Sequence, residues 1–67
     1  MALSARNRLT GVIEEIAWGD VLAHITIKIG DALVESVITR RSAQELGLKQ
    51  GDSVTAVVKA TEVMIEK

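Results

Sequence analysis

Apolar and polar residues alternate along much of this chain, which is the period of a β-strand and not of a helix. In the clearest run, residues 21–29, every second position is apolar: Val21, Ala23, Ile25, Ile27 and Ile29. Residues 8–16 and 32–39 are also rich in Val, Ile and Thr, which are enriched in strands. Gly11 allows a bend or bulge in the first of these runs. Gly30-Asp31 is a two-residue hairpin signal between the second and the third. We therefore predict three consecutive strands.

The alternation of apolar and polar residues ends after residue 39. Ser42 is the predicted N-cap of a short helix, and Glu45, three residues later, completes a capping box. Gly47 stands where a left-handed residue ends such a helix. After a turn at residues 49–52, the segments 53–59 and 62–66 are predicted to be two last strands. This order predicts an all-β fold: an OB-fold-like five-stranded barrel with one short helix between strands 3 and 4.

The length of 67 residues predicts a single domain, residues 1–67. A chain this short buries only about 60% of its unfolded surface, so the monomer is expected to be marginally stable. Disulfides are excluded because there is no Cys, and one His does not make a metal site. Oligomerisation is the remaining way to stabilise so short a chain, and the hydrophobic content of 48% agrees with it.

The charge balance narrows the list of partners. A net charge of −1 and a pI near 5.7 do not favour nucleic acid. No apolar run is long enough to span a membrane, and the first residues lack the features of a signal peptide, so we expect a cytoplasmic protein. Neither a nucleophile–base pair nor a Gly-rich phosphate loop is present, which predicts that the chain is not an enzyme and has no cofactor.

Three segments together resemble the Mop-domain (molbindin) family of small molybdate-binding proteins. They span nearly the whole chain, in the order found in that family: Ser4-Ala5-Arg6-Asn7-Arg8-Leu9-Thr10-Gly11, Ile38-Thr39-Arg40-Arg41-Ser42 with Glu45-Leu46-Gly47-Leu48, and residues 55–65 around Lys59-Ala60-Thr61. The resemblance implies the same OB-type fold and a homo-oligomer, a hexamer built as a trimer of dimers. It also implies binding of molybdate or tungstate for molybdenum storage or homeostasis, with the metal held only as its oxyanion.

The resemblance also implies which residues hold the oxyanion at a subunit interface: Ser4, Ala5, Arg6, Asn7, Ser42, Lys59 and Ala60. Asn7 matches the motif but can serve structure instead. Ala60 departs from relatives that carry Ser there, so only its backbone N–H remains as a donor. Molybdate offers four acceptor oxygens and no proton, so donors suit it: the Arg6 fork, the Lys59 ammonium, hydroxyls and backbone N–H groups. From the residues alone, these segments could meet within one barrel or between two chains.

Other interpretations remain open at this stage. Arg6 and Lys59 could be solvated cations, and Ser42 could serve only as a helix cap. Leu46 to Asp52 also resembles a turn of small dimeric β-type DNA-binding transcription regulators or antitoxins, although such a fold needs a basic face. A single-strand-binding OB domain is disfavoured because Trp18 is the only aromatic residue. We expect His24 at the surface or an interface, Trp18 packed in a loop or between subunits, and Arg40-Arg41 solvated.

Overall fold

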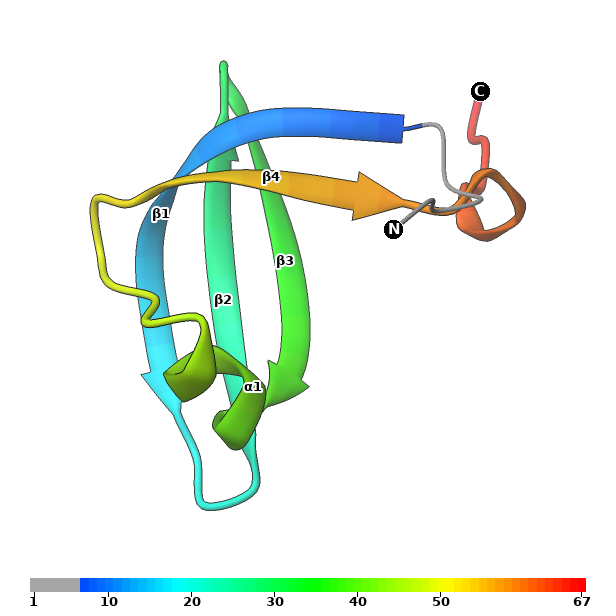
Figure 1. The fold of residues 1–67 in the computed structure, drawn as a ribbon. Coiled ribbons are helices and arrows are strands. Elements are labelled where there is room, and N and C mark those ends of the chain that lie inside the picture. The colour runs from blue at the N-terminus through cyan, green and yellow to red at the C-terminus, as the bar shows by residue number, and fades with distance from the viewer. Residues whose placement is uncertain (1–6) are drawn as a thin grey trace.

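The computed structural model describes residues 7–67 as one antiparallel sheet with a short helix (Figure 1). The elements are β1 (Asn7–Trp18), β2 (Leu22–Ile29), β3 (Ala32–Thr39), α1 (Arg40–Glu45), β4 (Ser53–Val58) and the 3-10 turn η1 (Ala60–Glu62). The strand order is β3-β2-β1-β4. The all-β prediction, with one short helix between the third and fourth strands, is therefore confirmed.

The long strand β1 serves two neighbours and bends between them. Its first half pairs with β4, from Asn7↔Val58 to Val12↔Ser53, and its second half pairs with β2 up to Trp18↔Ala23. The register shifts between Ile13 and Glu15, which marks a bulge there and not at Gly11. The sheet therefore curls into the open half-barrel that Figure 1 shows.

Gly11 is needed in β1 for close approach. A Cβ at this position would stand 2.4 Å from the Lys28 carbonyl oxygen and 2.6 Å from Cγ1 of Ile29. Both distances are far below van der Waals contact. Only a glycine lets β1 cross β2 this closely as it turns toward β4.

The core lies inside the curl and follows the alternation of the sequence. Ile13 from β1 packs with Ala23, Ile25 and Ile27 from β2, and Ala43 of α1 completes the buried cluster. The alternating positions of β2 thus face the core, as predicted. Val21 is the exception: it precedes the strand and is exposed.

The helix begins three residues earlier than the sequence suggests. Thr39, and not Ser42, is the N-cap, because its Oγ1 accepts a hydrogen bond of 3.0 Å from the Ser42 backbone N–H. The predicted capping box is wrong: Glu45 instead pairs with Arg41 one turn back, at 3.1 Å. Gly47 follows the helix with a φ of +64°, so its predicted left-handed conformation is confirmed.

The fold of the described chain contains four strands, so the prediction of a five-stranded barrel is not met within one chain. Ala60–Glu62 forms η1, and residues 63–67 have no strand partner among residues 7–67. This C-terminal tail does not add a fifth strand because the chain changes direction after β4. η1 turns the chain out of the line of β4, and Figure 1 shows the tail beyond the end of β4. The half-barrel consequently stays open between β3 and β4.

Candidate functional site

Of the N-terminal candidate residues, Asn7 alone lies in the described part of the chain. Ser4, Ala5 and Arg6 lie outside residues 7–67. Asn7 opens β1, is half-buried and pairs with Val58, the last residue of β4. Lys59 and Ala60 follow Val58 directly. The fold therefore brings Asn7 and the Lys59-Ala60 pair, 52 positions apart in the sequence, to the same end of the sheet.

The Lys59-Ala60 turn exposes a cation beside backbone donors. Lys59 is the N-cap of η1, and its carbonyl accepts a 2.9 Å hydrogen bond from the Glu62 N–H. The N–H groups of Ala60 and Thr61 belong to the first turn, where a helix has no acceptor of its own to offer them. An exposed ammonium next to such N–H groups is chemistry that attracts an anion. Glu62 in the same turn adds an opposing negative charge.

Ser42 lies on α1 with its hydroxyl set in a small polar network. The Thr39 hydroxyl donates to Oγ of Ser42 at 2.8 Å, which leaves the Ser42 hydroxyl hydrogen free for a further acceptor. Two backbone donors of the first helical turn are already used, since Arg40 N–H donates to the Val21 carbonyl at 2.8 Å and Ser42 N–H donates to Thr39. The Ser42 hydroxyl is therefore more available as a donor than the backbone N–H groups at the start of α1. Thr39 was not identified as the N-cap from the sequence, although Ser42 follows it by three residues, which is the spacing between an N-cap and the N–H that it accepts from.

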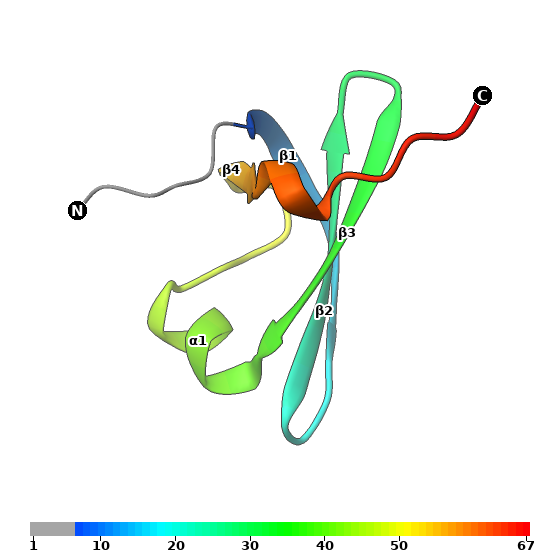
Figure 2. The ribbon, with the colours of Figure 1, turned by 90° about the vertical axis from the view of Figure 1, so that its right-hand side faces the viewer.

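The two groups of candidate residues lie apart in one chain. Figures 1 and 2 both show α1, which carries Ser42, well separated from the turn that carries Lys59. The structure thus joins Asn7, Lys59 and Ala60 but does not bring Ser42 to them. Of the two arrangements that the sequence left open, the one within a single barrel does not occur among these described residues.

Arg40 and Trp18 form a contact that the sequence analysis missed. Arg40 is half-buried, its Nη1 donates to the Gly19 carbonyl at 3.1 Å, and its guanidinium lies 5.9 Å from the centroid of the Trp18 ring. The expectation of a solvated Arg40 is therefore wrong, because the guanidinium ties the β1–β2 loop to α1. Arg41 does remain exposed and pairs only with Glu45.

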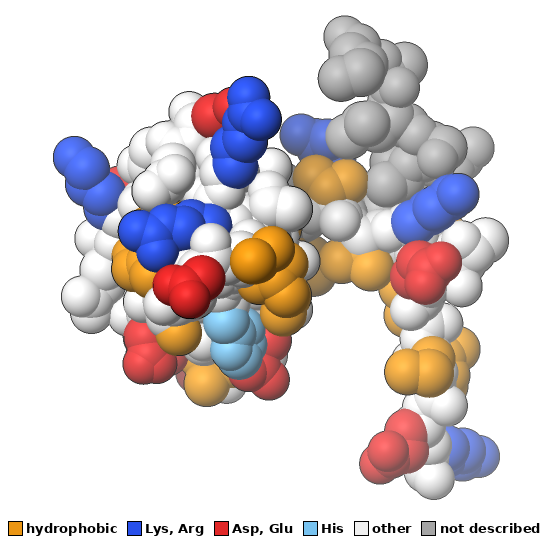
Figure 3. Space-filling view, turned by 90° about the horizontal axis from the view of Figure 1, so that it is seen from below, with side chains coloured by type: hydrophobic (Ala, Val, Ile, Leu, Met, Phe, Trp, Pro, Cys, Tyr) orange, Lys and Arg blue, Asp and Glu red, His pale blue; other side chains and the backbone are white. Residues whose placement is uncertain are grey.

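The outer face of the sheet carries charges of both signs. His24 Nε2 contacts Glu35 Oε1 at 2.8 Å across β2 and β3, and both side chains are exposed, in agreement with the predicted surface position of His24. A hollow lined by Glu14, Glu15 and Glu35 is acidic and unsuited to an anion. Figure 3 shows cations, carboxylates and apolar groups mixed over the face seen from below, with no single-sign field.

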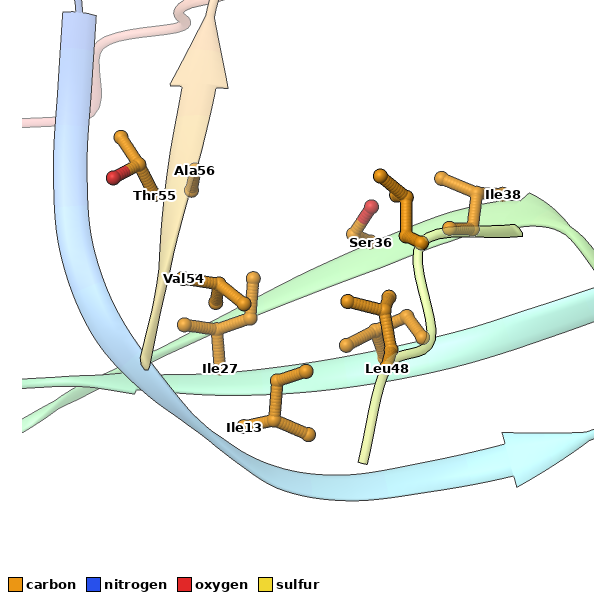
Figure 4. A pocket seen from close by; sticks show the side chains of 10 residues that line it. Ile13, Ile27, Ser36, Ile38, Leu48, Val54, Thr55 and Ala56 are labelled. Atoms are coloured by element: carbon orange, nitrogen blue, oxygen red, sulfur yellow. The ribbon is translucent and has the colours of Figure 1, made fainter. Parts of the chain in front are cut away.

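The inner face holds an apolar cavity of about 350 Å³ (Figure 4). It is lined by all four strands and by the segment that follows α1, and the lining is almost entirely aliphatic: Ile13, Ile25, Ile27, Ser36, Ile38, Leu46, Leu48, Val54, Thr55 and Ala56. Such a lining offers an oxyanion nothing but two hydroxyls. Between residues 7 and 67, the structure has no cluster of side chains able to hold a metal ion, and none of its helices has the length and apolarity to span a bilayer.

Comparisons with known proteins agree with this geometry. A model of the TOBE domain family matches residues 3–65. The chain is 44% identical to molybdenum-pterin-binding protein 2 of Clostridium pasteurianum, over 97% of each chain. A molybdate binding protein from Sporomusa ovata has the same fold, with a TM-score of 0.94 and 40% identity over the full length of both chains. The cytoplasmic molybdate-binding protein ModG, solved with molybdate bound, matches with a TM-score of 0.82 and 43% identity, over 90% of this chain and 43% of that one.

Proposed function

Because the chain belongs to the TOBE domain family and, within it, to the Mop proteins, we propose that it binds molybdate, or the similarly shaped tungstate, as an oxyanion. The observation that carries this proposal is the pairing of Asn7 with Val58, which sets the end of the motif at residues 4–7 beside the Lys59-Ala60 turn. Both segments belong to the ligand set that the sequence suggested. The role is passive storage or buffering of molybdenum, without catalysis and without a resident cofactor.

In this proposal the oxyanion is held by donors alone. Arg6 supplies a planar fork to two oxygens, Lys59 a compact charge, and Ser4 and Ser42 their hydroxyls. Ala5 and Ala60 supply backbone N–H groups, and Asn7 supports the segment. Phosphate near neutral pH keeps a proton, which such a site would leave unpaired, so it should bind worse than molybdate.

The separation of Ser42 from Lys59 supports a site shared between two chains. We propose that residues 1–67 form one Mop domain, that two domains complete each site, and that three such dimers assemble as a hexamer. The exposed apolar groups of the single chain, among them Val57, Met64 and Ile65, favour such assembly. A cytoplasmic location fits as well, because the similar protein ModG is described as cytoplasmic.

Two other functions are less well supported. Duplex DNA needs a concentrated basic face, and a chain with a net charge of −1 has few cations to concentrate there. The similar protein of Clostridium pasteurianum is named for a molybdenum-pterin, yet the cavity of this chain offers only the hydroxyls of Ser36 and Thr55. A pterin carries several ring donors and acceptors, which would stay unpaired there. We therefore propose the free oxyanion as the ligand.

Calorimetric titration tests the proposal. Molybdate and tungstate should bind tightly, sulfate more weakly, and phosphate little at neutral pH. Arg6→Ala should lower the molybdate affinity about tenfold to a hundredfold, because a hydrogen bond to a charged group is worth about 1.5–3 kcal/mol. Lys59→Ala should also weaken binding, and Arg6→Lys should restore part of the Arg6 loss.

The matched control is Arg41→Ala, which removes an exposed cation paired only with Glu45. This variant should bind molybdate as the parent does. Equal affinity of the parent for phosphate and molybdate would contradict a site made of donors. Parental affinity in both Arg6→Ala and Lys59→Ala, with the assembly intact, would show that the site lies elsewhere.

A further inference from the structure

The loop between β1 and β2 holds the start of α1 through two carbonyl groups. The Arg40 backbone N–H donates to the Val21 carbonyl at 2.8 Å, and Nη1 of the same residue donates to the Gly19 carbonyl at 3.1 Å. The loop itself is closed by the Gly19 N–H, which donates to the Leu22 carbonyl at 2.8 Å. Arg40 therefore attaches the first turn of α1 to this loop with both its main chain and its side chain.

Gly19 lets the loop close tightly enough to present that carbonyl. A Cβ at this position would stand 2.8 Å from the Leu22 carbonyl oxygen, which is closer than Cβ atoms approach backbone oxygens in proteins. A larger residue would force the loop open and move the group that accepts from Arg40. The position of this acceptor is thus set by the backbone of the loop and not by a flexible side chain.

Trp18 supplies a second surface against the Arg40 side chain. The guanidinium lies 5.9 Å from the centroid of the indole ring, which is within the range of a cation–π attraction. Because the guanidinium is planar and rigid, the ring and the Gly19 carbonyl together restrict its direction as well as its position. A lysine would keep the charge at this site but not the fixed direction.

The position of α1 depends on such contacts because the helix has only six residues. A helix of this length is not stable through its own hydrogen bonds. Ala43 anchors it to the core, and Arg40 anchors its first turn to the loop. Ser42 stands between these two anchors. Its Oγ accepts from the Thr39 hydroxyl at 2.8 Å and keeps its own hydrogen for a further acceptor.

We propose that Arg40 is a positioning residue of the oxyanion site and acts through Ser42. Its contacts with Gly19 and Trp18 hold the first turn of α1, so that the Ser42 hydroxyl is already in place when the anion arrives. A hydroxyl on a mobile turn would have to be ordered during binding, which costs affinity. Arg40 itself does not touch the ligand in this role, because its guanidinium is engaged by the loop. The inference rests on the oxyanion function proposed above.

A double-mutant cycle between Arg40 and Ser42, measured by calorimetric titration with molybdate, tests this role. Arg40→Ala should lower the affinity about threefold to tenfold, and Ser42→Ala at least as much, because the loss passes through one hydroxyl. In the Ser42→Ala background, Arg40→Ala should change the affinity less than about twofold, since the group that it positions is gone. An equal loss in both backgrounds, or no loss in either, would overturn the proposal.

Two further variants break the same contact without removing a charge. Gly19→Ala displaces the accepting carbonyl, and Trp18→Leu removes the aromatic ring. Each should lower the molybdate affinity, and neither should lower it further once Ser42 is replaced by Ala. Arg40→Lys keeps the charge and should still bind more weakly than the parent. Parental affinity in all three variants would show that Arg40 acts only by its charge, which would contradict positioning.

The matched control for charge is Arg41→Ala, which removes the neighbouring exposed cation and should bind molybdate as the parent does. A loss as large as that of Arg40→Ala would mean that any cation on α1 serves and would overturn the role. Sedimentation velocity and thermal melting without ligand establish that each variant keeps the parent's assembly. If Arg40→Ala does not, Trp18→Leu takes its place in the cycle, with the same expected outcomes.

The titration of the parent separates this inference from the oxyanion function. If the parent binds no molybdate, the oxyanion proposal fails and the positioning role falls with it. If the parent binds molybdate tightly while the cycle shows no coupling between Arg40 and Ser42, only the positioning role fails.

Discussion

The strand β2 and the C-terminal tail carry the same kind of sequence and end in opposite situations. β2 alternates apolar and polar residues, and the tail carries three apolar residues in a row, Val63, Met64 and Ile65. In β2 the alternate positions Ala23, Ile25 and Ile27 are buried between β1 and β3, whereas Met64 and Ile65 in the tail are almost fully exposed. The difference lies in the neighbours and not in the residues. β2 has a strand on each side, and the tail has no strand partner among residues 7–67.

This comparison shows what alternation specifies. A period of two tells which side chains share a face, but the face is buried only where a sheet edge and a second layer are available. Stability should therefore depend on β2 at every protein concentration. It should depend on the tail only where a second chain supplies the missing edge.

The largest expected effect comes from emptying the core under β2. Ile25 is 2% exposed, so Ile25→Ala should lower the free energy of unfolding by about 2–5 kcal/mol. Urea denaturation at several protein concentrations measures this loss of stability. The loss should persist at the lowest protein concentration. If the variant lost stability only at high protein concentration, the contribution of β2 would depend on a second chain, as that of the tail does, and the comparison would be contradicted.

A somewhat smaller loss of stability is expected when a side chain is added at Gly11, where β1 crosses close to β2. Gly11→Ala adds a Cβ 2.4 Å from the Lys28 carbonyl oxygen, so β1 must shift. We expect a loss of about 1–3 kcal/mol in the free energy of unfolding, which is typical of overpacking. Thr10→Ala, at the exposed neighbouring position, is the control. Equal stability of the two variants would show that β1 does not cross so closely.

The helix cap should contribute about 1 kcal/mol to the free energy of unfolding. Thr39→Ala removes the oxygen that accepts from the Ser42 N–H, whereas Ser42→Ala leaves this bond in place. Thermal melting without ligand should therefore show a clear loss for Thr39→Ala and a smaller one for Ser42→Ala. The reverse order would restore the N-cap that the sequence suggested.

The smallest effect on a single chain is expected in the tail. Ile65→Ala should change the unfolding free energy by less than about 0.5 kcal/mol at concentrations where the chain is monomeric, because the side chain touches little there. At high concentration the variant should melt below the parent, since it loses burial in the partner. A large loss in the dilute monomer would mean that the tail packs against its own chain.

Much of the fold was predictable from local sequence. The alternation of residues 21–29 identified the inward face of β2, and Gly47 identified the end of α1. The N-cap was misplaced because Thr39 and Ser42 both suit that role locally. Their order was decided by the sheet, where Arg40 N–H donates to the Val21 carbonyl and so fixes where the helix begins.

The candidate site was only partly predictable for a similar reason. Lys59 and Asn7 were selected by motif, and their proximity follows from the register Asn7↔Val58, which no local pattern reveals. The Arg40 contact with Trp18 was missed because it joins a loop to a helix 22 positions away in the sequence.

By itself, the sequence indicated the four strands that form, which of their faces are apolar and where the chain must turn, because these depend on side-chain period and on glycine geometry. Only the tertiary structure decided that β1 divides itself between β2 and β4, and that the last apolar run is left outside. Both depend on long-range hydrogen bonding between strand edges, which short stretches of sequence do not encode. Among residues 7–67 the sheet has two free edges, and the strand-like segment 62–66 pairs with neither of them.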